Sequence, residues 1–334
     1  MKHLCLSLLL MSAATTAQSD PIDSALDTHI LPRMEELSLT SQRLADVAAQ
    51  DCAPTSADLR AAYGRAFDAW ITVSHLRFGP TETDNRAFAM AYWPDSKGFT
   101  PKALSGLLRN SDPAIQTAEG FANVSIAARG FYAMEFLLYD PDLSVAGAPD
   151  YHCQLVRRVA QDIASTADII HQDWNDTYAT LLRTPGPDGR YRTEQEAKQE
   201  LYKSLLTGLQ LTADMRLGRP LGSFERPRPK RAEARRSGRS LRHVELALTS
   251  MRDLAATLAS DHPDIAARIL RDFDQALERA RTLDDPVFAS VASPTGRFKV
   301  ESLQQLVQEV RTRVETELAP TLGVSAGFNS LDGD

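Results

Sequence analysis

Apolar residues recur at spacings of three and four along almost the whole chain, and this helical periodicity is what most constrains the fold. One such stripe runs through Leu59, Tyr63, Ala66, Trp70 and Val73. No segment shows the strict alternation of polar and apolar residues that marks a half-buried strand. The sequence therefore predicts an all-α protein, and its 334 residues are enough for two hydrophobic cores.

A break in the periodicity divides the chain. The segment Thr184–Gly189 carries two prolines and two glycines, which end helices. We therefore expect two packed helical bundles of about four long helices each, over residues 20–183 and 190–322, and a flexible tail at 323–334. The expected helices span 22–49, 56–78, 101–109, 112–139, 150–182, 194–217, 239–259, 263–282 and 299–318.

The first 17 residues have the pattern of a secretory signal peptide. Lys2 precedes an apolar stretch that ends at Met11, and small residues up to Ala17 offer a cleavage site. The stretch is too short to cross a bilayer, so we expect an exported, periplasmic protein that does not span the membrane. Export and a net charge of −7 both argue against a nucleic-acid partner.

Of the three cysteines, Cys5 lies in the expected signal peptide, which leaves Cys52 and Cys153. An oxidising compartment favours a disulfide between the last two. The alternative is two unrelated buried thiols.

Glu135 stands where a core residue belongs. In the helix expected over 112–139 it lies in the middle of an apolar stripe, between Phe131 and Leu138, with Tyr132 beside it. A buried carboxylate must be paired, hydrogen-bonded, metal-bound or protonated. Glu135 is therefore the leading candidate for a functional residue, and the alternative is a structural ion pair with an arginine of another helix.

Three stretches, in order along the chain, together resemble the imelysin family of exported bacterial proteins. The first runs over 70–80 and continues at Trp93-Pro94-Asp95, and the third covers 232–241. The second, 130–138, is similar to the family's Gly-x-His-x-x-Glu helix, with Glu135 at the glutamate. The resemblance implies two helical bundles, an envelope location and a link to iron uptake or iron-regulated expression. Some family members are described as metallopeptidases.

This chain departs from the family motif because Tyr132 stands at the position of the histidine. A Tyr–Glu pair supplies only oxygen ligands, which suit ferric iron better than they suit a zinc peptidase. No His-Glu-x-x-His sequence occurs elsewhere to supply a zinc site.

Other residues join the candidate site on weaker grounds. His75 and Asp95 are possible further metal ligands beside Glu135, although a lone histidine on an apolar face is more often a structural core residue, and Asp95 could equally cap a turn. Trp93 is a candidate wall of the site. In the basic stretch that follows residue 219, Arg239 is expected to turn inward and pair with Glu135, with Ser237 beside it.

The first hypothesis is a non-enzymatic periplasmic protein that binds iron, or another metal or small ligand, between the two bundles, and serves a periplasmic or membrane iron-uptake partner. In it Tyr132, Glu135, Arg239, Ser237 and Trp93 bind the ligand, and Glu135, His75 and Asp95 hold the metal. The alternatives are a metallopeptidase with an altered metal site and a protein–protein interaction module.

Overall fold

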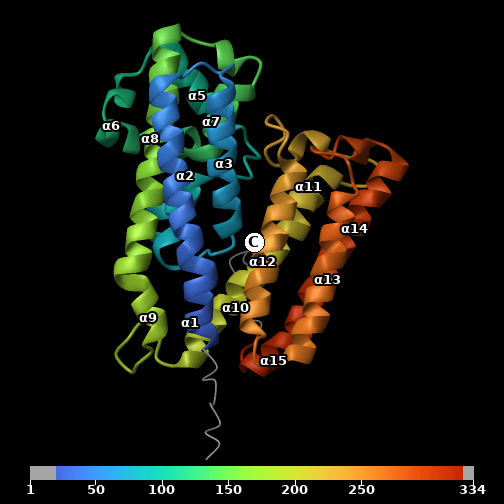
Figure 1. Cartoon of the computed structure of the whole chain (residues 1–334). Coiled ribbons are helices and arrows are strands. Elements are labelled where there is room, and N and C mark those ends of the chain that lie inside the picture. Colours follow the sequence, from blue (N-terminus) through green and yellow to red (C-terminus); the bar gives the residue numbers. More distant parts are fainter. Residues whose placement is uncertain (1–19, 326–334) are drawn as a thin grey trace, which may run out of the picture.

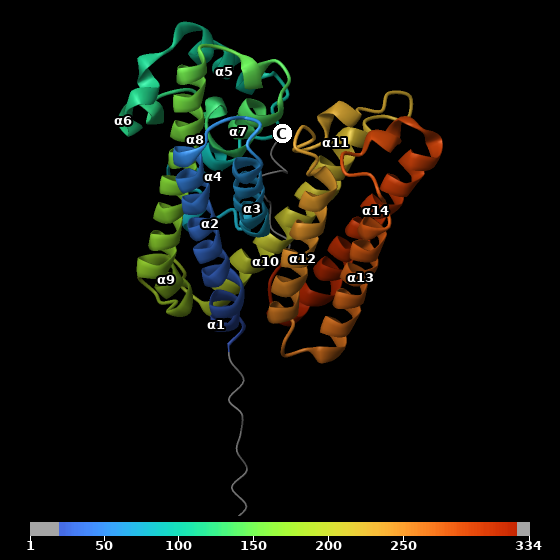
Figure 2. The same cartoon turned by 45° about the horizontal axis from the view of Figure 1, so that its top comes forward.

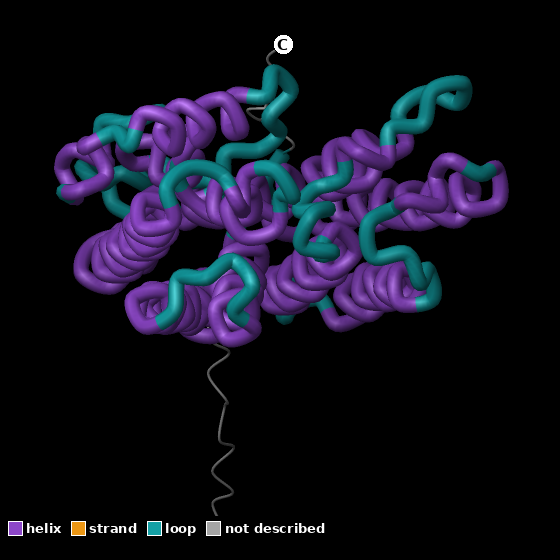
Figure 3. The backbone as a smooth tube through the Cα atoms, turned by 90° about the horizontal axis from the view of Figure 1, so that it is seen from above, coloured by secondary structure: helices purple, strands orange, loops and turns teal. Residues whose placement is uncertain are grey.

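The computed structural model describes residues 20–325. Over these residues the chain is built of helices and connecting loops, without a β-strand (Figure 3). The predicted all-α class is therefore confirmed. The expected signal peptide, 1–17, and residues 326–334 of the expected tail lie outside the described residues.

The first half of the chain forms one group of helices (Figure 1). In this group α2 packs against α3 and α8, and α7 packs against α8. The long members are α2 (Leu31–Gln50), α3 (Ala57–Val73), α5 (Phe99–Asn110), α7 (Gly130–Tyr139) and α8 (Pro149–Asp173), and the short ones are α1 (Pro21–Ala25), α4 (Arg86–Met90), α6 (Ala118–Ala122) and α9 (Ala179–Arg183).

The second half forms a neighbouring group, in which α12 packs against α10 and α13, and α14 packs against α13. Its members are α10 (Glu194–Gln210), α11 (Gly218–Leu221), α12 (Ser240–Leu258), α13 (Pro263–Arg281), α14 (Pro294–Arg313) and α15 (Ala319–Leu322). The groups meet chiefly where α12 lies along α3 and α1. Figure 2 shows α7 and α11 at corresponding ends of the two groups. The domain boundaries at 183 and 190 stay a prediction.

Side chains with hydroxyl or carboxylate oxygens start several helices. Asp20, Ser56, Thr193 and Ser293 each accept a hydrogen bond from a backbone N–H in the first turn of the helix that follows. Four of the long helical runs continue through π-helical turns, at Leu26–Ile30, Trp174–Tyr178, Leu211–Leu217 and Val314–Leu318. Such turns shift the register of the side chains that follow them.

The single helix expected over 112–139 is wrong. The chain there forms a 3₁₀ turn, the short helix α6, a second 3₁₀ turn and then α7. Thr117 accepts a hydrogen bond from the N–H of Gly120 and restarts the helix at α6. Gly130 has a φ of +72°, and a Cβ there would stand 2.2 Å from the carbonyl oxygens of Ala89 and Met90. Close approach of two backbones therefore sets the start of α7 and the position of Glu135.

The disulfide between Cys52 and Cys153 is confirmed. It joins the segment that follows α2 to the N-terminal part of α8, with the two Cα atoms 5.2 Å apart. It closes a loop with a sequence separation of 101, which contains α3 to α7. Within residues 20–325 no helix is long and apolar enough to cross a membrane.

Candidate functional site

Glu135 is buried, as expected, with 2% of its surface exposed. Its Oε1 atom accepts two hydrogen bonds from Ser237, one from the backbone N–H at 2.9 Å and one from the hydroxyl at 2.7 Å. Ser237 lies in the loop before α12, so the two helical groups meet at this carboxylate. Burial raises the pKa of Glu135, and the hydrogen bonds from Ser237 act in the opposite direction.

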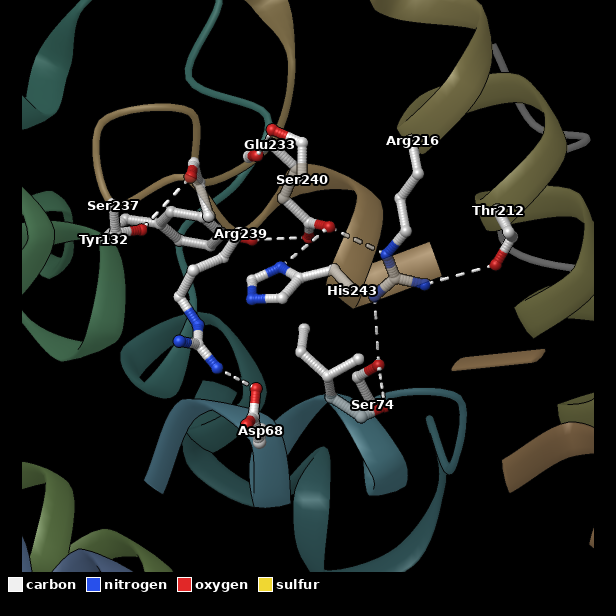
Figure 4. Close-up of polar contacts among 12 residues, drawn as sticks. Asp68, Ser74, Tyr132, Thr212, Arg216, Glu233, Ser237, Arg239, Ser240 and His243 are labelled. Atoms are coloured by element: carbon white, nitrogen blue, oxygen red, sulfur yellow. Dashed lines mark hydrogen bonds and ion pairs between the residues drawn. The ribbon is translucent and has the colours of Figure 1, made fainter. Parts of the chain in front are cut away.

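Tyr132 donates its hydrogen bond to a different carboxylate. Its hydroxyl lies 2.6 Å from Oε1 of Glu233, which is also buried and precedes α12 (Figure 4). The other oxygen of Glu233 accepts a hydrogen bond of 2.8 Å from Nε of Arg216. The Nδ1 atom of His243 lies 3.1 Å from the same oxygen, outside hydrogen-bond geometry. Glu233 is thus held by α7, by the π-helical turn Leu211–Leu217 and by α12.

Charge fixes the protonation of this cluster. Burial alone would raise the pKa of Glu233, but the charge of Arg216 and the hydrogen bond from Tyr132 act against burial, and the pKa is lowered to about 2. Burial lowers the pKa of His243, and burial together with Glu233 raises that of Tyr132. The cluster at neutral pH is therefore an ionised Glu233–Arg216 pair with a neutral tyrosine and a neutral histidine.

The expected pairing of Arg239 with Glu135 is wrong. Arg239 turns inward but binds α3, where its guanidinium donates to the carboxylate of Asp68 (Figure 4). It also donates, at 2.9 Å, to the carbonyl of Gly64. The backbone explains the difference, because the turn ahead of α12 directs Ser237 toward α7 and Arg239 toward α3.

A cavity of about 230 Å³ opens beside Glu135. Trp93, Asp95 and Tyr132 also line it, so four of the predicted site residues share one cavity. Asp95 caps α5 there, accepting hydrogen bonds from the N–H groups of Phe99 and Thr100. The basic members of the lining are Arg219, Lys230, Arg231 and Arg236.

His75 lies elsewhere. Its Nε2 atom is 3.1 Å from Nε2 of His29, both rings are buried, and it is absent from the lining of the cavity. The structure thus does not bring His75 to Glu135 and Asp95, and no group of three or more His, Cys, Asp or Glu residues in 20–325 is arranged to hold a metal ion. Their expected role as joint metal ligands is not supported by this geometry.

Sequence reasoning missed Glu233, Arg216, His243 and Arg219. Glu233 lay inside the stretch 232–241 that carried the family resemblance, and its place between two alanines is the one signal that could have drawn attention to it. Arg216 looked like an ordinary basic residue at a helix end, because only the fold places it 2.8 Å from a buried carboxylate.

Comparison with known proteins places this site in a family. The family model described as Imelysin (Peptidase_M75) matches residues 30–314, which cover most of both helical groups, apart from α1 and α15, and every residue of the cluster around Glu233. The chain belongs to the imelysin family. It is 25% identical to "Iron-regulated protein A" of Synechococcus elongatus over 292 residues, or 80% of this chain and 76% of that protein.

Two solved structures share the imelysin fold. An imelysin-like protein from Psychrobacter arcticum 273-4 superposes with a TM-score of 0.77 at 18% identity, covering 92% of this chain and 96% of that one. A putative iron-regulated protein A precursor from Parabacteroides distasonis gives 0.74 at 13% identity, covering 91% and 97%. At these identities the likeness concerns the fold alone.

Proposed function

We propose that this imelysin-family chain is an exported, non-enzymatic binding protein of the periplasm, and that its ligand carries iron and occupies the cavity beside Glu135. Its role is to present that ligand to an iron-uptake partner in the periplasm or membrane. The iron link rests on the names of two similar proteins, which are described as iron-regulated.

One observation carries the binding role. Oε1 of Glu135 is occupied by Ser237, whereas Oε2 accepts no hydrogen bond from the described part of the chain. Glu135 also lines the cavity. A carboxylate with one oxygen held and the other open to a cavity is a preorganised hard donor for a ligand or for its metal.

The surroundings favour binding over peptide hydrolysis. The residue at the position of the motif histidine, Tyr132, has its hydroxyl engaged by Glu233 and a raised pKa, so it stays a neutral hydrogen-bond donor. A catalytic zinc ion needs about three protein ligands and an open position for water. Around Glu135 the cavity offers Asp95 as a second carboxylate, and both of its oxygens already cap α5.

The variant Glu135→Gln tests the proposal. The glutamine oxygen can still accept both hydrogen bonds from Ser237, so we expect the melting temperature to be nearly retained while binding of ferric citrate, followed by tryptophan fluorescence and calorimetry, is lost. Glu119→Gln, an exposed change on α6, is the matched control. Equal binding by both variants, or no binding of any iron form by the wild-type protein, would overturn the proposal.

A further inference from the structure

We propose that the ligand of this cavity is an anion, a small oxygen-rich chelate whose negative charge is bound by Arg219, Arg231 and Lys230 while its metal faces Glu135. This inference deepens the proposed function and rests on it for the position of the ligand.

The first observation is a difference among the basic residues near the cavity. Arg236 pairs with Asp140, and both Arg239 and Arg242 pair with Asp68. Within the described chain, by contrast, Arg219, Lys230 and Arg231 make no ion pair with a carboxylate, and all three line the cavity. Of these three residues, Arg219 is partly buried, whereas Lys230 and Arg231 are exposed.

The second observation concerns the two guanidinium groups. Burial lowers the pKa of Arg219, and the nearby positive charge of Arg231 lowers it further. The Nε atom of Arg219 is also buried and has no hydrogen-bond partner among residues 20–325. The repulsion between the charges of Arg219 and Arg231 is unfavourable, and so is the buried Nε–H of Arg219 that has no acceptor. An oxyanion relieves both, because guanidinium binds carboxylate or phosphate oxygens through paired N–H donors.

The third observation is that Arg219 is held in place. Its guanidinium carbon lies 5.6 Å from the centre of the Trp93 ring, which in turn stacks on Tyr132 with ring centres 6.3 Å apart. A cation over an aromatic face is attracted to it and is restricted in its motion. The aromatic pair therefore positions the cation of Arg219 on the same cavity that Glu135 lines.

Charge and size together select the ligand class. A bare metal cation would meet four basic side chains, and a simple anion would meet the carboxylate of Glu135. A metal chelated by carboxylates suits both kinds of side chain. The metal ion can be coordinated by the open oxygen of Glu135, and the free carboxylate oxygens of the chelate can accept hydrogen bonds from the arginines. The volume of about 230 Å³ is below the roughly 300–1,000 Å³ of drug-sized sites, which favours a small polycarboxylate chelate over a bulky siderophore.

Calorimetric titrations with ferric citrate, citrate alone and inorganic phosphate test the inference in the full chain. We expect Arg219→Gln and Arg231→Gln each to weaken binding of ferric citrate about ten- to a hundredfold, as the loss of a charge-assisted hydrogen bond implies. Neither substitution breaks an ion pair of the folded protein, and Arg219→Gln loses only the contact with the Trp93 ring, so the melting temperature should fall little. Arg226→Gln is the matched control, because Arg226 is exposed in the same basic loop and does not line the cavity.

The outcomes separate this inference from the function on which it rests. If Glu135→Gln abolishes binding of ferric citrate but the two arginine variants bind like Arg226→Gln, the anionic class is wrong and the proposed function stands. If citrate or phosphate binds as tightly as ferric citrate and depends on both arginines, the anion site stands and the iron link fails. Absence of any binding by the wild-type protein overturns both.

Discussion

Ser237 holds one oxygen of Glu135 with two hydrogen bonds, from its N–H and from its hydroxyl, across a sequence separation of 102 residues. The serine thereby orients the carboxylate and offsets part of the cost of burying its charge. Through Ser237, the loop before α12 therefore controls the orientation and pKa of a carboxylate on α7, which belongs to the other half of the protein.

Ser237→Ala should raise the pKa of Glu135 further. The hydroxyl hydrogen bond favours the ionised carboxylate, and its loss leaves burial, which favours the protonated form, less opposed. A carboxyl carbon titration by NMR measures the shift. Ser223→Ala, an exposed change in the same connecting segment, should leave the titration unchanged. An unaltered pKa in Ser237→Ala would show that the backbone N–H alone sets the charge.

Glu233→Gln should destabilise the protein by about 3–5 kcal/mol, because it leaves the buried guanidinium of Arg216 without a counter-charge. The control is Asp274→Asn, which breaks the more exposed ion pair with Arg252 and should cost less than about 1 kcal/mol. Urea unfolding at neutral pH compares the two. Similar small losses in both variants would mean that water enters the cluster and solvates Arg216.

The buried pair of His29 and His75 should make the protein less stable in mild acid. Burial, followed by the charge of Arg33, lowers the pKa of His75 to about 3, and burial also lowers that of His29. The unfolded chain binds protons below about pH 6.5, whereas the folded rings do not, so stability present above that pH is lost as the pH falls toward 3.

For each histidine the loss approaches about 1.4 kcal/mol per pH unit. Unfolding free energies measured between pH 7 and 5, above the range in which most carboxylates titrate, should therefore fall less steeply in His75→Gln than in the wild-type protein. His171→Gln, at a partly exposed site on α8, should keep the wild-type slope. An unchanged slope in His75→Gln would place the proton uptake on other groups.

Gly130→Ala should destabilise the fold. The positive φ costs an alanine about 1–3 kcal/mol, and the clash with two carbonyl oxygens adds to this. Gly106→Ala should instead stabilise by up to about 1 kcal/mol, because a Cβ at that position of α5 meets no atom within 4 Å. Thermal melts of the two variants should move in opposite directions. A tolerated alanine at Gly130 would show that segment 86–91 can move away from α7.

The sequence was sufficient for features that depend on local pattern. Helical periodicity gave the all-α class, the cysteine count gave the disulfide, and the apolar stripe around position 135 gave a buried carboxylate. The sequence was insufficient to predict helix boundaries that are set by close contact between two distant backbone segments. The contact of Gly130 with residues 89 and 90 interrupts the expected helix over 112–139, and no property of that segment alone reveals its neighbour.

The sequence also could not predict which residues pair with the buried charges. Ser237 rather than Arg239 binds Glu135, although the two residues are two positions apart and both belong to the stretch singled out in advance. The choice depends on a few ångströms of backbone geometry in one turn. Lys230, Arg231 and Arg236 were visible within a basic run, but nothing in their order separates Arg231, which lines the cavity, from Arg226, which does not.

The cluster around Glu233 has a consequence for assembly of the molecule. Tyr132 reaches it from α7, while Ser74, at the end of α3, accepts a hydrogen bond from Arg216 at 3.2 Å. Sliding the halves by one helical turn would keep apolar surface in contact but would leave an ionised pair facing hydrocarbon with its outer hydrogen bonds unmade. Apolar packing brings the halves together, and these polar bonds give them a single register.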